Sequence, residues 1–284
     1  MTATRVITAA ILIPVVIAVI WWGAPALIAA VAAIVAVLAV LEFFSLGERV
    51  GLKGYRFWTC ICAVLLLFQQ LQATLSERTS ISHDVVFVHQ PAAFTLSLEM
   101  VHLIFVFGAG AIAVFSSLPL AEVLSDLGIS AAALLFVALP FSAAIRLDAI
   151  SPRLLLFALA MIWVGDSFAY FIGRWLGRHR MTPQLSPHKT WEGALANLAG
   201  SMLLGALAAR WVGYGIGDML GMAALGNIAG QFGDLLESAY KRSAGVKDSG
   251  SILPGHGGML DRIDALVLSL PVVWYYFQLV VAAR

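Results

Sequence analysis

Residues 24–45, APALIAAVAAIVAVLAVLEFFS, form an unbroken apolar stretch with a single charged side chain. A helix needs about 20 such residues to cross the hydrocarbon core of a bilayer. The whole chain has this character, because 61% of its 284 residues are hydrophobic and 12% are charged. A soluble domain has ~25% charged residues. The sequence therefore predicts an all-α, polytopic integral membrane protein.

Outward from this stretch, the chain divides into nine apolar segments separated by polar or Gly- and Pro-rich breaks. Nine spanning helices would use roughly 180 residues, which leaves no long polar block for a separate soluble domain. The first segment could be a cleaved signal peptide. Its apolar part is long, however, and Trp21 and Trp22 suit a membrane interface, so we expect an uncleaved helix. The segments are residues 5–22, 24–45, 57–72, 98–117, 128–146, 153–173, 194–213, 214–236 and 263–283.

The distribution of Lys and Arg predicts how these segments are oriented. With nine spans, the N-terminus and the loops after spans 2, 4, 6 and 8 share one side, which holds 12 of the 17 Lys and Arg residues. We therefore expect a cytoplasmic N-terminus and an external C-terminus, in the cytoplasmic (inner) membrane of a bacterium. The net charge of +1 gives no basic excess of the kind that binds nucleic acid.

Ionic residues are unevenly divided between the two halves of the chain. Residues 1–150 hold no large ionic cluster and are predicted to be a scaffold of transmembrane helices. Residues 151–284 hold two long polar loops and are predicted to be the catalytic region. Asp166 and Asp234 lie within apolar segments of this half, where a charge costs about 2.5–3.5 kcal/mol at the bilayer centre. We expect them to line a wet cavity; the alternative is that they sit near helix ends and reach the headgroup layer.

Helical spacing places several charges of this half together. Asp234, Glu237 and Lys241 share one helix face, at i, i+3 and i+7. Asp261 and Asp264 share a face of the next, antiparallel helix. Asp234 and Asp261 can therefore approach each other from the two sides of the connecting loop. Carboxylate oxygens held on helices suit Mg²⁺, whose ligand shell the phosphates of a substrate would complete.

The loop within residues 234–264 adds cations and glycines to these carboxylates. An ordinary cytoplasmic loop would explain the cations, but not the carboxylates or the Gly-His-Gly-Gly run at 255–258. Cations suit phosphate oxygens, and glycines let backbone N–H groups approach an anion, although no Walker A or GxGxxG motif is present. His256 is a candidate contact to phosphate or base, and Lys189 in SPHKTWEG (186–193) is a candidate phosphate ligand. These features indicate phosphoryl or nucleotidyl transfer onto a lipid.

The same region resembles the signature of the phosphatidate cytidylyltransferases, the CDP-diacylglycerol synthases. Residues 238–264 match the spaced pattern S-x-x-K-R-x4-K-D-x-G-x-x-L-P-G-H-G-G-x-x-D-R-x-D without a gap. SPHKTWEG and GDSFAYFIGR (165–174) resemble segments of that family as well. Motifs carry the resemblance across about residues 160–265, and hydropathy and span number alone carry it in the N-terminal half.

The resemblance implies the reaction CTP + phosphatidate → CDP-diacylglycerol + pyrophosphate and a requirement for Mg²⁺. It leaves room for a second cation such as K⁺ and for a homodimer. The implied metal ligands are Asp234, Asp261 and Asp264. The implied catalytic set is Asp234, Lys241, Lys247, Asp248 and Asp261. The implied substrate-binding residues are Asp166, Ser186, Lys189, Arg242, His256, Gly257, Gly258 and Arg262.

Two other functions stay open from the sequence. A CTP-dependent lipid-alcohol kinase of the dolichol or phytol type has related loops, but it transfers a phosphoryl group to an alcohol. An ion-coupled transporter would explain Asp166, Asp218 and Asp234 within apolar segments. Transporters often pair broken helices in two halves, however, whereas the ionic residues gather in one half of this chain. A CDP-alcohol phosphotransferase is disfavoured, because its D-G-x2-A-R…G-x3-D-x3-D pattern is absent.

Overall fold

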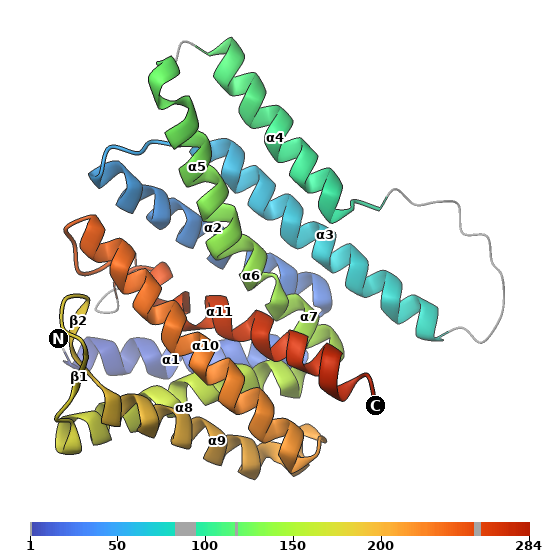
Figure 1. Ribbon diagram of the computed structural model, residues 1–284. Coiled ribbons are helices and arrows are strands. Elements are labelled where there is room, and N and C mark those ends of the chain that lie inside the picture. Colours follow the sequence, from blue (N-terminus) through green and yellow to red (C-terminus); the bar gives the residue numbers. More distant parts are fainter. Residues whose placement is uncertain (1, 83–94, 117–118, 253–256) are drawn as a thin grey trace.

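The computed structural model describes residues 2–82, 95–116, 119–252 and 257–284. These residues fold almost entirely into helices, with one short two-stranded antiparallel hairpin. This architecture confirms the predicted all-α polytopic fold (Figure 1).

The first half of the chain begins with four long helices: α1 (Thr2–Trp22), α2 (Pro25–Arg49), α3 (Arg56–Ser82) and α4 (Leu98–Phe115). A more broken helical run follows. It consists of the 3₁₀ turn η1 (Leu120–Glu122), α5 (Val123–Ala133), the π-helical turn η2 (Leu134–Ala138), α6 (Leu139–Phe141) and α7 (Ala143–Ile150). The irregular part of this run surrounds Pro140, which lacks the N–H group that a continuous α-helix requires.

The second half carries the hairpin between two long helices. Its elements are α8 (Pro152–Leu176), β1 (Arg180–Thr182), β2 (Ser186–Thr190), α9 (Trp191–Val212), α10 (Ile216–Ser243), α11 (Leu260–Tyr276) and the π-helical turn η3 (Phe277–Val281). The Ser151 side chain accepts a hydrogen bond from Arg153 N at 3.2 Å and caps α8. Gly213, with φ of 99°, ends α9 in the left-handed conformation that glycine adopts without strain.

Seven helical runs within the described ranges are long and apolar enough to cross a membrane: Pro25–Arg49, Arg56–Ser76, Leu98–Phe115, Leu120–Ile150, Pro152–Leu176, Trp191–Val212 and Leu260–Val281. All nine predicted segments contain helix, but the count of nine spans is not confirmed. The apolar stretch of α1 whose side chains are described is Ala10–Trp22, and within the described residues it is not counted among the seven runs. α10 is not among these seven runs. Its glycines, Asn227, Gln231 and its acidic residues lower its mean hydropathy.

α10 packs closely against α9 and α11 through small residues. A Cβ at Gly205 of α9 would lie 2.9 Å from the Met219 carbonyl oxygen, and one at Gly233 would lie 2.5 Å from the Asp264 carbonyl oxygen. Small residues let helix backbones approach each other in membranes, where packing rather than the hydrophobic effect drives association. This contact places Asp234 directly beside the first turns of α11.

Loops distant in the sequence meet at one end of the molecule, near the hairpin (Figure 1). Gly54 N donates to Asp126 Oδ1 at 2.9 Å, which joins the α2–α3 turn to α5. Met259 N donates to Glu42 Oε1 at 2.9 Å, which joins the start of α11 to α2. Loops predicted to share one side of the membrane therefore lie together, and their assignment to the cytoplasm stays a prediction.

Candidate active site

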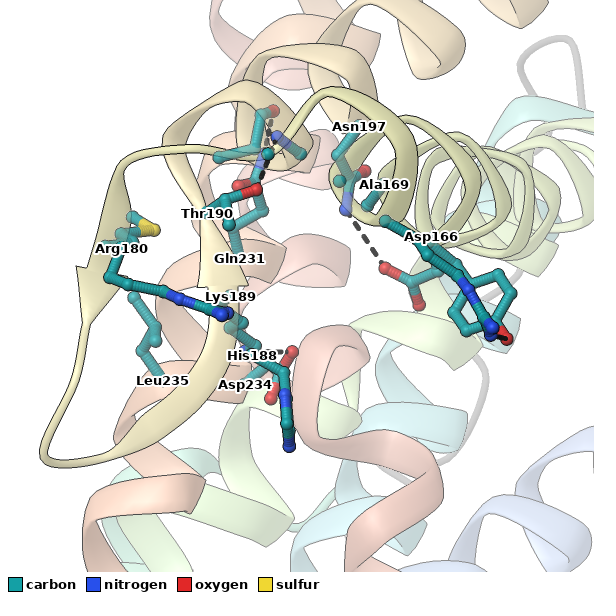
Figure 2. Close-up of a pocket in the computed structure, with 17 residues that line it drawn as sticks. Asp166, Ala169, Arg180, His188, Lys189, Thr190, Asn197, Gln231, Asp234 and Leu235 are labelled. Carbon is teal, nitrogen blue, oxygen red and sulfur yellow. Dashed lines mark hydrogen bonds and ion pairs between the residues drawn. The ribbon is translucent and has the colours of Figure 1, made fainter.

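A polar pocket of about 550 Å³ opens between α8, the hairpin, α9 and α10. Its walls carry both signs of charge, with Asp166 and Asp234 on the acidic side and Arg174, Arg180 and Lys189 on the basic side. Figure 2 shows the Lys189 side chain reaching from the hairpin toward Asp234, with Asp166 on the opposite side of the pocket. The structure thus brings three of the residues predicted from sequence to one cavity.

The hairpin is fixed at the start of α9, which holds Lys189 in place. The Thr190 side chain accepts a hydrogen bond from Gly193 N at 3.1 Å and caps α9. Glu192 Oε1 lies 2.6 Å from His179 Nδ1, on the chain that leads into β1. Lys189 Nζ forms an ion pair with Asp234 Oδ2, so the hairpin is also joined to α10.

Asp166 is held by amide side chains that sequence reasoning missed. Asn197 Nδ2 donates to Asp166 Oδ1 at 3.0 Å, as Figure 2 shows. Asn227 Nδ2 donates to Asn197 Oδ1 at 2.5 Å, and Gln231 Nε2 donates to Asn227 Oδ1 at 2.7 Å. A Cβ at Gly165 would overlap the Asn197 amide, so glycine makes room for this network. The sequence feature that could have indicated this network is the presence of uncharged amides inside apolar helices. Such amides are costly to bury unless they are hydrogen-bonded.

A second cluster lies where α10 and α11 meet. Lys241 Nζ donates to Asp261 Oδ1 at 2.7 Å and is ion-paired with Glu237. Asp261 also accepts hydrogen bonds from the backbone N–H groups of Ser249, at 3.0 Å, and Gly258, at 2.8 Å. Three donors therefore fix the Asp261 carboxylate at the N-terminus of α11, where the helix dipole also favours a negative charge.

Glu42 of α2 belongs to the same cluster, although the sequence analysis assigned it to the scaffold. Its carboxylate accepts hydrogen bonds from Ser249 Oγ at 2.8 Å, Met259 N at 2.9 Å and Leu260 N at 2.8 Å. No periodicity or motif in the C-terminal half could have found this residue. It is separated from Ser249 by 207 positions in the chain.

In the contacts of the described residues, the predicted metal-binding carboxylates bond to other groups and not to one another. Asp264 Oδ1 accepts a hydrogen bond from the Ala265 N–H at 2.7 Å. Asp234 is instead paired with Lys189, and Asp261 with Lys241. Among the residues that the structure describes, no group of three or more His, Cys, Asp or Glu side chains is arranged to hold a metal ion. Each predicted ligand thus has a lysine or a helix backbone as its neighbour.

Three predicted substrate-binding residues lie on or against the hairpin: Lys189, Ser186 and Arg242. Arg242 Nε donates to the Leu185 carbonyl oxygen at 3.1 Å, and its Nη1 donates to the Val246 carbonyl oxygen at 2.7 Å. Arg242 therefore joins the hairpin to the loop after α10. Ser186 is half-buried at the start of β2.

The other predicted residues lie in the loop before α11 or at its start. Lys247, Asp248 and Arg262 are exposed. Gly257 has φ of 79°, and a Cβ there would lie 2.6 Å from Asp261 Oδ2, so only glycine suits this position. His256 lies outside the described residues.

An apolar groove of about 250 Å³ adjoins the polar pocket. Met181, Ala194, Gln231 and Leu235 line both cavities. The groove runs between α9 and α10 and is otherwise apolar, with large exposed side chains at its walls. These are Trp191, Leu195, Ile228 and Phe232. A polar cavity and an apolar surface that faces outward are therefore continuous.

Comparison with known proteins agrees with this combination. Residues 3–280 match the model of the cytidylyltransferase family. A phosphatidate cytidylyltransferase of Synechocystis sp. is 48% identical over 126 residues, which are 43% of this chain and 42% of that protein. One of Brucella abortus is 44% identical over 126 residues, 43% of this chain and 46% of its own length.

A phosphatidate cytidylyltransferase of Staphylococcus aureus is 40% identical over 121 residues, 42% of this chain and 46% of that protein. The chain thus covers less than half the length of the curated relatives it matches, whereas the family match extends over nearly all of it.

Proposed function

Because the chain belongs to the cytidylyltransferase family, we propose that it transfers the cytidylyl group of CTP to phosphatidate and releases pyrophosphate. The observation that carries this proposal is the polar pocket lined by Lys189, Asp234 and Asp166, which continues into an apolar groove. Such a site suits one reactant with several phosphates and another that is anionic at one end and apolar at the other.

Cations of the pocket would hold the triphosphate and the lipid phosphate. Lys189, Arg174 and Arg180 line it, and such groups neutralise charge that builds on the transferred phosphoryl group. An oxygen of the phosphatidate phosphate would attack the α-phosphorus of CTP. A new P–O bond forms as the bond from the α-phosphorus to the bridging oxygen breaks, and pyrophosphate leaves. The attacking phosphate is already an anion, so no strong general base is needed.

Asp234 and Asp261 would hold Mg²⁺, with Asp264 as a further ligand. Carboxylate oxygens are the donors that Mg²⁺ prefers, and the two aspartates have lysine ammonium groups as partners in the structure. Movement of Lys189 to a substrate phosphate would leave the Asp234 carboxylate free for the cation, while Asp261 would bind it from its fixed position beside Lys241. Bound Mg²⁺ would neutralise phosphate charge. A second cation such as K⁺ is an expectation from the resemblance alone, as is a homodimer.

The lipid would reach the pocket from the bilayer through the apolar groove. Leu195 and Phe232 on its walls are 65% and 61% exposed, which suits contact with acyl chains rather than with water. CTP would enter from the opposite, aqueous side. We propose that this side is the cytoplasm, with a cytoplasmic N-terminus in the inner membrane of a bacterium, as the Lys and Arg distribution indicates.

An assay of the purified protein tests this function. The protein in lipid nanodiscs is supplied with phosphatidate, Mg²⁺ and CTP labelled at the α-phosphorus. We expect label in a lipid product and one pyrophosphate released for each product formed. A lipid-alcohol kinase would need an alcohol acceptor and would place only the γ-phosphorus in lipid. Absence of both label transfer and pyrophosphate would refute the proposal.

A further inference from the structure

Glu42 is a buried carboxylate of α2, and the residues beside it on this helix are apolar. It is 5% exposed, and its neighbours Val40, Phe43 and Phe44 are buried as well. A buried carboxylate is costly unless hydrogen bonds replace the water it loses. Its position therefore requires an explanation that membrane anchoring of α2 does not supply.

The partners of Glu42 all belong to the two ends of one loop. Oε1 accepts a hydrogen bond from Met259 N at 2.9 Å, and Oε2 accepts from Leu260 N at 2.8 Å. These N–H groups open α11 and have no partner within that helix. Ser249 Oγ, at the far end of the loop, donates to Oε2 at 2.8 Å. One side chain of α2 thus links the two ends of the loop between α10 and α11.

Glycines of the loop make this contact geometrically possible. A Cβ at Gly250 would lie 2.5 Å from Glu42 Oε1, and one at Gly258 would overlap Oε2. Both positions can therefore hold only glycine while the Glu42 carboxylate occupies this site. The Gly-rich character of the loop, which the sequence suggested was for phosphate, is explained at these two positions by the carboxylate of α2.

The same loop residues hold Asp261. Ser249 donates its hydroxyl to Glu42 and its backbone N–H to Asp261 at 3.0 Å. Gly258 donates its N–H to Asp261 at 2.8 Å. Leu260, whose N–H donates to Glu42, directly precedes Asp261 in the chain. A displacement of Glu42 would therefore release both backbone donors of Asp261 together.

We propose that Glu42 is a positioning residue of the active site, which holds the loop so that Asp261 is presented in a fixed orientation. The proposal rests on the proposed function, in which Asp261 is a ligand for the divalent cation. It assigns a role in catalysis to α2, in the half of the chain that the sequence indicated to be scaffold. Glu42 acts through Ser249, Met259 and Leu260 and does not touch the reactants.

Hydrogen exchange tests the contact without any activity. In the metal-free protein, we expect the backbone N–H groups of Met259 and Leu260 to exchange at least about tenfold faster in Glu42→Gln than in the wild type. Glu48→Gln is the matched control, because Glu48 lies on the same helix, is exposed and pairs with Arg56. Equal exchange in the Glu42 and Glu48 variants would overturn the proposal.

Kinetics separate positioning from stability alone. We expect Glu42→Gln to raise the Mg²⁺ concentration for half-maximal activity by about 10- to 100-fold, with Glu42→Asp restoring part of the loss. A purely structural carboxylate would lower the melting temperature and leave this concentration unchanged, which would refute the proposal. If Glu42→Gln does not fold, Ser249→Ala gives the same readouts. An inactive wild type would count against the proposed function, whereas the exchange result would still decide the Glu42 contact.

Discussion

The site contains two lysine–aspartate pairs that differ in how firmly they are held. The side chains of Lys189 and Asp234, at the polar pocket, are 30% and 32% exposed, whereas those of Lys241 and Asp261 are 11% and 5% exposed. An exposed pair separates at little cost, but a buried pair leaves an uncompensated charge when one partner goes. We infer that the first pair opens for ligands and that the second forms the fixed frame of the site.

The largest effect is expected from Asp261→Asn. This change leaves buried Lys241 opposite a neutral amide and removes a predicted metal ligand. We expect cytidylyltransferase activity to fall by about 10³-fold or more, measured as pyrophosphate release at saturating CTP. Asp218→Asn is the control, because Asp218 forms an ion pair with Arg284, 3.1 Å away, outside the site. Activity of Asp261→Asn near that of the control would remove Asp261 from the site.

Stability should separate the two lysines directly. Lys241→Met removes the partner of buried Asp261 and Glu237, so we expect a loss of about 3–5 kcal/mol in the free energy of unfolding. Lys189→Met breaks the half-buried, more exposed pair and should cost less than about 1 kcal/mol. Both should impair activity, and Lys189→Met should do so mainly through a higher KM for CTP. Thermal unfolding of the two variants side by side measures the difference, and equal losses would contradict the distinction between the pairs.

The sequence predicted what depends on local pattern. Hydropathy placed helices at all nine apolar segments, because burying a backbone in lipid requires its hydrogen bonds to close within the segment. The spacing of Asp234 and Lys241 on α10 located the charged face that meets α11. The family signature named Asp261, which lies at the centre of the second cluster.

Contacts between distant segments could not be predicted from pattern. Glu42 looked like one charge at the end of a span, and only the packing of α2 against α11 reveals its three donors. Spacing alone also suggested that Asp234 and Asp261 lie together. In the structure each aspartate is paired with a lysine. Helical periodicity could not predict the pair of Lys189 with Asp234, because Lys189 lies on a hairpin.

Removal of the amide network tests whether Asp166, which lines the polar pocket with the Lys189–Asp234 pair, needs a fixed orientation. Asn197→Ala removes the donor to Asp166 and the acceptor for Asn227, so buried polar groups lose partners at a cost of about 1–3 kcal/mol. We expect activity to fall by about tenfold, as for other residues that orient a site from behind. Ser167→Ala is the control, because its hydroxyl bonds only to the Trp163 carbonyl oxygen of its own helix in the described contacts. Normal activity of Asn197→Ala would show that Asp166 needs no such support.

The smallest effect is expected in the apolar groove, where only acyl contacts change. Leu195→Trp would fill part of the groove and displace one or two methylene groups of the lipid. At about 0.8 kcal/mol each, their loss corresponds to a roughly 4- to 15-fold higher KM for long-chain phosphatidate. The KM for CTP and for a short-chain phosphatidate should not change, because neither reaches the groove. Leu207→Trp is the matched control on the same helix, 73% exposed and outside the groove. An equal KM for long-chain phosphatidate in both variants would show that the lipid approaches the pocket by another face.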